Sequence, residues 1–288
     1  MSSKKRQGSE AHKNMQKTSH SLQEVPTFII NLPQSTDRKT FMEAQCDSIG
    51  ISPIFIDAVN GKGLSDSEIN KYCNQRKAKQ LFGRELLLGE IGCALSHIHV
   101  YQKMVDKNIA YAVIFEDDAI IKKDFTDTIK LVLDINFDWD LILLGHNIGF
   151  DISNEIKSIK SYWYKKKVNN STNIGRIVKG GLGCYGYLIT QQGAKKILDY
   201  INKESIFYPI DKITSNNKII NFYGVFPTIV SINSNFNSSI DEFGNRKNDR
   251  DGEMIYKIGK LVKKTPFFNI TRALWFQYLR VKPIKKYN

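Results

Sequence analysis

The sequence lacks the features that mark several common functional classes. It has four cysteines in 288 residues and no C-x-x-C pair, so it indicates no structural zinc site and fits reduced thiols in a cytosolic setting. No apolar run approaches the roughly 18 residues that cross a bilayer, and the first residues do not resemble a signal peptide. We therefore expect neither a transmembrane helix nor a disulfide framework.

Neither of two glycine-rich phosphate-binding motifs occurs in the context that it requires. No G-x-G-x-x-G follows a predicted strand, and no G-x-x-x-x-G-K-[ST] occurs anywhere in the chain. These absences argue against a dinucleotide-binding fold and against a P-loop. A diphosphate that binds without a glycine cradle needs a metal ion to neutralise its charge.

The net charge of +13 is concentrated at the two ends of the chain. Residues 1–24 hold five basic and two acidic side chains, and residues 255–288 hold nine basic and no acidic ones. The span 25–254 is left with a net charge of only +1. A basic nucleic-acid-binding protein is the alternative from another class, but the neutral body and the lack of a recognition motif favour a protein without a nucleic-acid partner.

The order of predicted elements is typical of an α/β fold. Helical spacing predicts helices over 35–50, 89–108, 124–135 and 191–201, while residues 146–179 are polar and are expected to be irregular. The segments that predict strands are 27–32, 53–59, 111–121, 139–145, 180–190 and 224–232. This alternation implies a mostly parallel sheet with helices on both faces, which binds ligands beyond the carboxyl ends of its strands.

One strand, YAVIFEDDAII (Tyr111–Ile121), contains three consecutive carboxylates, Glu116, Asp117 and Asp118. Like charges at contact distance raise one another's pKa unless a positive charge lies among them, and hard cations such as Mn²⁺ or Mg²⁺ take oxygen ligands of this kind. In an extended segment Glu116 and Asp118 share one face, so this pair is the predicted metal clamp. A turn or a helix cap would account for one of these acids, but not for all three. A nucleotide diphosphate bridged to the carboxylates by the ion is the predicted ligand.

Five stretches of the chain occur in a characteristic order between about Thr27 and Ile240. They are FIINLPQSTDRK, LLLGEIGCALSHIHVYQKM, AVIFEDDAII, DLILLG and GGLGCYGYLITQQGAKKIL, the last followed by PID. Together they resemble glycosyltransferase family 25, which includes lipooligosaccharide galactosyl- and glucosyltransferases of Gram-negative bacteria. The resemblance implies a GT-A type, Rossmann-like fold that transfers a hexose from a UDP-sugar with inversion, galactose being preferred over glucose as the predicted sugar.

The resemblance also implies roles for individual residues. Asp118, with Glu116, would ligate Mn²⁺ or Mg²⁺. Asp211 would be the general base that removes the proton of the acceptor hydroxyl, with Asp117 and His97 as further catalytic candidates. The residues implied to contact the donor are Asn31, Arg38, Asp57, Glu90, His97, Asp117 and Gly181.

Structural alternatives remain open for several of these residues. A Pro-x-Asp sequence is also an ordinary turn and helix cap, which would explain Asp211. His97 could be a satisfied buried histidine, and the glycines at 180–183 could mark a strand bend.

The chain is expected to have three parts: a disordered leader (1–25), a GT-A domain (26–254) and a basic amphipathic C-terminal helical extension (255–288). The last part mixes aromatic and basic side chains, which favours an anionic membrane surface as its partner; a terminal helix packed on the domain is the alternative. With the lipid-linked oligosaccharide acceptor that the resemblance implies, the protein would lie on the cytoplasmic face of the inner membrane.

Overall fold

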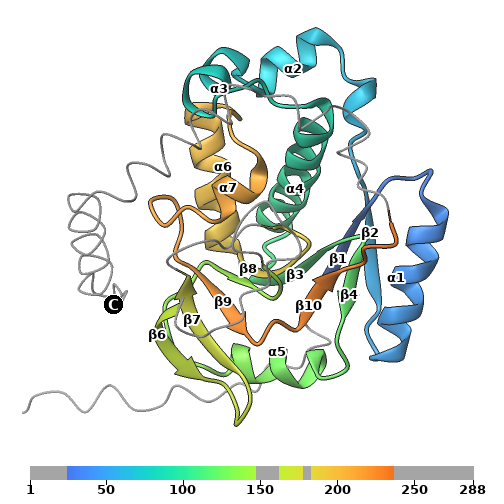
Figure 1. Cartoon of the computed structure of the whole chain (residues 1–288), viewed down its shortest axis with the longest axis vertical. Coiled ribbons are helices and arrows are strands. Elements are labelled where there is room, and N and C mark those ends of the chain that lie inside the picture. The colour runs from blue at the N-terminus through green and yellow to red at the C-terminus, as the bar shows by residue number, and fades with distance from the viewer. Residues whose placement is uncertain (1–24, 147–161, 178–182, 237–288) are drawn as a thin grey trace, which may run out of the picture.

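The computed structural model describes residues 25–146, 162–177 and 183–236 (Figure 1). Residues 1–24 of the predicted leader and the basic C-terminal segment lie outside the described residues, and so do Gly180 and Gly181. In the described part of the chain, no helix combines the length and the apolar character that crossing a membrane requires.

An eight-stranded sheet runs through the middle of the molecule in the order β2-β1-β3-β8-β5-β9-β7-β6, and a two-stranded sheet pairs β4 with β10 (Figure 1). The strands are β1 (Thr27–Asn31), β2 (Pro53–Asp57), β3 (Tyr111–Glu116), β4 (Ala119–Ile121), β5 (Leu141–Leu143), β6 (Tyr162–Lys167), β7 (Asn173–Ile177), β8 (Gly186–Thr190), β9 (Phe222–Phe226) and β10 (Val230–Ile232).

Most strands of the large sheet run in one direction. β1 is parallel to both β2 and β3, and β5 is parallel to β9. β8 lies between β3 and β5 and is antiparallel to both, so these two strands share the direction of β1. The sheet is therefore mixed but dominated by one direction, which agrees with the predicted GT-A type of α/β fold.

Helices cover both faces of the sheet, and each face has its own hydrophobic core (Figure 1). Successive residues of β3 alternate between these cores: Ala112 and Ile114 face one, while Val113 and Phe115 face the other. This explains why the strand reads as a continuous apolar run. The helices are α1 (Thr36–Ser48), α2 (Asp66–Tyr72), α3 (Gln75–Leu81), α4 (Leu88–Asp106), α5 (Phe125–Leu133), α6 (Gln191–Glu204) and α7 (Ile210–Thr214), with a short 3₁₀ helix, η2 (Gly61–Gly63).

Three sequence-based expectations were wrong in detail. Within the segment expected to be irregular, β6 and β7 form an antiparallel hairpin at the edge of the large sheet. The lysines of β6 concealed it, because charged side chains are a common feature of edge strands. The predicted strand 111–121 is divided by a turn at Asp117 and Asp118, and the predicted strand 224–232 is divided between β9 and β10, which belong to different sheets.

The first turns of α4 pack against η2 through a contact that only glycine permits. A Cβ atom on Gly92 would lie 2.5 Å from the carbonyl oxygen of Val59 and 2.8 Å from the amide nitrogen of Gly61. Because both neighbours are backbone atoms, a side chain at this position must move the segment after β2. This contact therefore fixes the position of that segment against the helix.

We expect Gly92→Ala to lower the free energy of unfolding by about 1–3 kcal/mol, the usual cost of overpacking. Urea denaturation measures this change. Gly63→Ala is the matched control, because a Cβ on Gly63 meets nothing within 4 Å. Equal losses in the two variants would show that the close contact at Gly92 is not what stabilises the packing.

His146 follows β5 and is buried. Burial lowers the pKa of its imidazole from 6.5 to about 3, so the folded protein holds this side chain neutral. The unfolded chain takes up a proton below pH 6.5, and the stability that this histidine contributes above that pH is lost as the pH falls toward 3.

Between pH 7.5 and pH 5, we expect the wild-type protein to lose about 2 kcal/mol more unfolding free energy than His146→Gln. Urea denaturation at the two pH values gives the comparison. Parallel pH dependences in the two proteins would contradict the assignment of this stability loss to His146.

Candidate functional site

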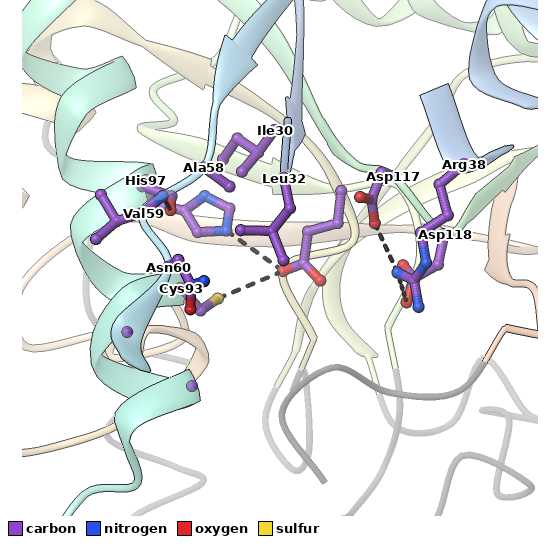
Figure 2. Close-up of a pocket in the computed structure, with 14 residues that line it drawn as sticks. Ile30, Leu32, Arg38, Ala58, Val59, Asn60, Cys93, His97, Asp117 and Asp118 are labelled. Atoms are coloured by element: carbon purple, nitrogen blue, oxygen red, sulfur yellow. Dashed lines mark hydrogen bonds and ion pairs between the residues drawn. The ribbon is translucent and has the colours of Figure 1, made fainter. Parts of the chain in front are cut away.

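The candidate site is a pocket at the carboxyl ends of β1, β2 and β3, beside the first half of α4 (Figure 2). Glu116, Asp117 and Asp118 all line it, as does Arg38 of α1. The remaining wall comes mainly from residues 58–61, which follow β2, and from side chains of α4. We refer to this cavity as the acidic pocket; it lies where a mostly parallel sheet is expected to bind its ligand.

Arg38 supplies the positive charge that the cluster of acids requires. Its Nη1 atom donates to Asp117 Oδ1 at 2.7 Å and lies 4.0 Å from Asp118 Oδ2. The other oxygen of Asp117 accepts from Asn31 Nδ2 at 2.8 Å. Asp117 is therefore buried, ionically paired and tied to both α1 and β1. Asn31 reaches the site through this contact.

Asp118 is less well compensated. Its Oδ1 atom is buried and has no hydrogen-bond partner among the described residues. Burial, together with the charges of Glu116 and Asp117, raises the pKa of Asp118 from 3.8 to about 7, although Arg38 acts in the opposite direction. An unpaired carboxylate oxygen beside two further carboxylates is a suitable ligand for a hard divalent cation. The residues present therefore fit the predicted metal ion.

Glu116 points to the other side of the pocket, toward α4. Its Oε1 atom lies 3.3 Å from His97 Nε2 and accepts a long hydrogen bond from Cys93 Sγ at 3.9 Å. His97 Nδ1 lies 2.7 Å from the hydroxyl of Tyr187, which in turn lies 2.7 Å from the hydroxyl of Tyr101. A buried chain of polar groups thus connects the pocket to the interior between α4 and β8.

One arrangement of protons that satisfies this chain has a neutral His97 and an ionised Glu116. Neutral His97 then donates from Nε2 to Glu116, and its Nδ1 accepts the proton of the Tyr187 hydroxyl. The Tyr187 oxygen accepts from Tyr101. Burial raises the pKa of both tyrosines well above the usual value of 10, so both hydroxyls keep their protons.

The turn after β3 changes the expected geometry of the acids. In an extended chain Glu116 and Asp118 would share a face, but the backbone turns at residues 117 and 118. As a result, Asp117 and Asp118 lie near Arg38, while Cys93 and His97 approach from α4 on the opposite side (Figure 2). The acids still line one pocket, and the pairing of Glu116 with Asp118 on a metal stays a prediction.

Glu90 and Asp57 lie outside the wall of the acidic pocket. The carboxylate of Glu90 accepts two hydrogen bonds from Arg84, at 2.8 and 2.7 Å, and one from the amide of Leu87 at 2.9 Å. It thereby caps the N-terminus of α4. Asp57 is exposed at the end of β2, and the pocket wall begins with the next residue, Ala58.

Asp211, the predicted general base, lies in the first turn of α7. Its Oδ1 atom is buried without a hydrogen-bond partner among the described residues. Burial is the main cause that raises its pKa, and the charges of Glu116 and Glu90 raise it further. Asp211 is therefore in the electrostatic field of the pocket without forming its wall. Gly181 lies outside the described residues.

Sequence reasoning missed the two tyrosines behind His97. Tyr101 carried a usable signal, because it lies four residues after His97 on α4 and therefore on the same helical face. Tyr187 carried none, because its contact with His97 depends on β8 being the neighbour of β3, which no local pattern reveals. Cys93, on the same helix as His97, both packs against the core and lines the pocket.

Comparisons with known proteins agree on one family. The family profile described as "Glycosyltransferase family 25 (LPS biosynthesis protein)" matches residues 24–214. Procollagen galactosyltransferase 1-A of Xenopus laevis is 29% identical over 188 residues, which cover 60% of this chain and 28% of the relative. A glycosyltransferase 25 family member of Aedes aegypti is 31% identical over 193 residues, which cover 64% of this chain and 29% of the relative. The match thus spans less than a third of either relative.

Among solved structures, a glycosyltransferase involved in glycosylation of the major capsid of PBCV-1 aligns with 69% of this chain and 80% of its own, at 9% identity and a TM-score of 0.36. That resemblance is too distant to bear on the function of this protein.

Proposed function

This chain belongs to glycosyltransferase family 25, and we propose that it transfers galactose from UDP-galactose to a lipooligosaccharide or lipopolysaccharide acceptor. The proposed transfer inverts the anomeric carbon and requires a divalent metal ion. The galactosyltransferases among its animal relatives support galactose as the sugar. The family description, which names lipopolysaccharide biosynthesis, supports the acceptor. UDP-glucose is the alternative donor.

The observation that carries this proposal is the unpaired Asp118 oxygen within the acidic pocket. Asp118 and Glu116 would hold Mn²⁺ or Mg²⁺, and the bound ion would offset the negative charge that grows on the departing UDP. Arg38 adds a fixed positive charge to the same wall, while Asn31 and Arg38 hold Asp117 in place. With the ion bound, the pocket would offer the positive charge that a nucleoside diphosphate requires.

Proton removal from the acceptor is assigned to Asp211. A raised pKa makes its carboxylate a better proton acceptor than an exposed aspartate. As the proton leaves, the acceptor oxygen attacks C1 of the donor sugar from the face opposite UDP. A single displacement inverts the anomeric carbon, so the proposal requires no covalent intermediate on the protein.

A donor screen tests the proposal directly. The full chain is incubated with lipooligosaccharide and with each UDP-sugar, with and without Mn²⁺, and the release of UDP is measured. We expect Mn²⁺-dependent release to be fastest with UDP-galactose. Fastest release with UDP-glucose would support the alternative donor, and no release with any UDP-sugar would overturn the proposed activity.

The basic segment 255–288 would hold the protein on the cytoplasmic face of the inner membrane. Cosedimentation with vesicles that contain phosphatidylglycerol tests this assignment against the chain truncated after residue 254. We expect salt-sensitive binding that the truncation removes while UDP release persists. Binding that is equal in both chains would contradict the assignment.

A further inference from the structure

A second set of ligand groups lies in the acidic pocket, apart from Asp118. Cys93 and His97 are four residues apart on α4, so both point from the same helical face (Figure 2). Glu116 meets them from the end of β3. One ligand atom of each residue (Sγ, Nε2 and Oε1) lies within 4.8 Å of the other two.

The spacing of these atoms resembles that of a tetrahedral zinc site. Zinc bonds of about 2.3 Å to sulfur and about 2.0–2.1 Å to nitrogen and oxygen place the ligand atoms roughly 3.3–3.6 Å apart. The His97 Nε2–Glu116 Oε1 distance is 3.3 Å and the Cys93 Sγ–Glu116 Oε1 distance is 3.9 Å. Small side-chain rotations of Cys93 would therefore complete the geometry.

The thiolate, imidazole and carboxylate together favour a metal ion that is intermediate between hard and soft, such as Zn²⁺. A thiolate and an imidazole favour Zn²⁺, whereas Mg²⁺ and Mn²⁺ prefer sets of oxygen ligands. All three residues line the pocket, so an ion can reach them from solvent and keep a fourth position open.

His97 also has the outer contact that a metal-binding histidine usually makes. Its Nδ1 atom lies 2.7 Å from the Tyr187 hydroxyl, which is bound to that of Tyr101. A metal on Nε2 requires the proton on Nδ1, where it would donate to the Tyr187 oxygen. Because hydroxyls both donate and accept, the two tyrosines can serve His97 with or without the metal.

We propose that Cys93, His97 and Glu116 form a zinc site that is separate from the proposed hard-ion site at Asp118. On binding, the Cys93 thiol loses its proton to solvent and its sulfur bonds to the zinc ion. Because Glu116 belongs to both ligand sets, zinc at this site would compete with manganese for its carboxylate. This inhibitory consequence rests on the proposed function, but zinc binding itself does not.

Cobalt substitution tests the site without any assay of sugar transfer. The full-length, metal-free protein is titrated with Co²⁺, and the near-ultraviolet charge-transfer band of a cobalt–thiolate bond is recorded. Zn²⁺ affinity is then measured by competition with a chromophoric chelator. We expect one Zn²⁺ per chain and a cobalt–thiolate band that Cys93→Ser removes.

Two further variants locate the ligands. His97→Gln is expected to weaken Zn²⁺ binding roughly 100-fold, and Tyr187→Phe, which removes the outer contact, roughly 10-fold. Cys184→Ser is the matched control: this buried thiol contacts Thr214 Oγ1 at 3.2 Å, and serine preserves that hydrogen bond. Circular dichroism confirms that each variant is folded.

The outcomes separate this proposal from the proposed function. A band that persists in Cys93→Ser, or that is lost in Cys184→Ser, overturns the assignment of the thiol ligand. No stoichiometric Zn²⁺ binding by the wild-type protein overturns the site as a whole. If Co²⁺ and Zn²⁺ bind as expected but no UDP-sugar is consumed, the zinc site stands and only the proposed transfer reaction fails.

Discussion

Asp118→Asn is expected to reduce Mn²⁺-dependent UDP release by about 100-fold or more while making the metal-free protein more stable. The first effect follows because an amide is a poorer metal ligand than a carboxylate. The second follows because burial and two neighbouring acids raise the pKa of Asp118 to about 7. Above that pH the folded protein must hold an ionised Asp118 carboxylate that is buried beside two other acids. In the unfolded chain the same carboxylate is exposed to water, so its ionisation is not penalised.

The raised pKa of Asp118 makes the wild-type protein less stable as the pH rises. In the wild-type protein, stability is lost as the pH rises from about 4 to about 7, because the folded state holds the Asp118 proton longer than the unfolded state does. Asp118→Asn removes this loss. At pH 8 in EDTA, urea denaturation should therefore give the variant a free energy of unfolding about 1–3 kcal/mol higher than that of the wild-type protein. The advantage should disappear near pH 4.

Asp127→Asn is the control, because this aspartate on α5 is 87% exposed and lies outside the pocket. It should change neither UDP release nor stability by a measurable amount. A destabilised Asp118→Asn protein, or one with undiminished Mn²⁺-dependent activity, would contradict the proposal that Asp118 is a buried carboxylate that ligates the metal ion.

Arg38→Met is expected to lower the free energy of unfolding by about 3–5 kcal/mol, because it leaves Asp117 buried without its cationic partner. The Arg38 and Asp117 side chains are only 11% and 12% exposed and their atoms are 2.7 Å apart, so water replaces little of the lost interaction. UDP release should fall as well, since Arg38 lines the pocket.

A double-mutant cycle separates the loss of the pair from the loss of packing. In Arg38→Met/Asp117→Asn the carboxylate that Arg38 paired is removed as well, and the asparagine oxygen can still accept the hydrogen bond from Asn31. Urea denaturation should then show that the double variant regains more than half of the stability that Arg38→Met loses. Strictly additive losses would mean that Arg38 stabilises the fold through contacts other than Asp117.

The sequence predicted most of the elements that place the site, because their signals are local. The helical spacing of α4 extends over several turns, and this helix formed close to its expected bounds. The apolar run of β3 also marked a strand, which began where expected but ended at Glu116. The insertion of β8 between β3 and β5, against their direction, depends on which distant segments meet. No periodicity within a single segment contains that information.

The types of the residues predicted the chemistry of the site better than the extended backbone expected for residues 116–118 predicted its geometry. The crowding of Glu116, Asp117 and Asp118 correctly indicated a need for positive charge, and Arg38 provides part of it. The expected sharing of a face by alternate acids failed, because a turn replaced the extended chain. Glu90 carried the same chemical signal as the other acids, yet the structure uses it to cap a helix.

The turn that carries Asp117 and Asp118 is completed by a segment much later in the chain. The amide of Asn233 donates to the carbonyl of Asp118 at 2.8 Å, and the ring of Phe236 lies 5.0 Å from the guanidinium of Arg38. A ribosome that has just passed Asp118 has therefore made every acid of the pocket but not the segment that fixes them. Nascent chains can begin to fold from their N-terminal residues, but they acquire a finished acidic pocket only after Asn233 and Phe236 have been made.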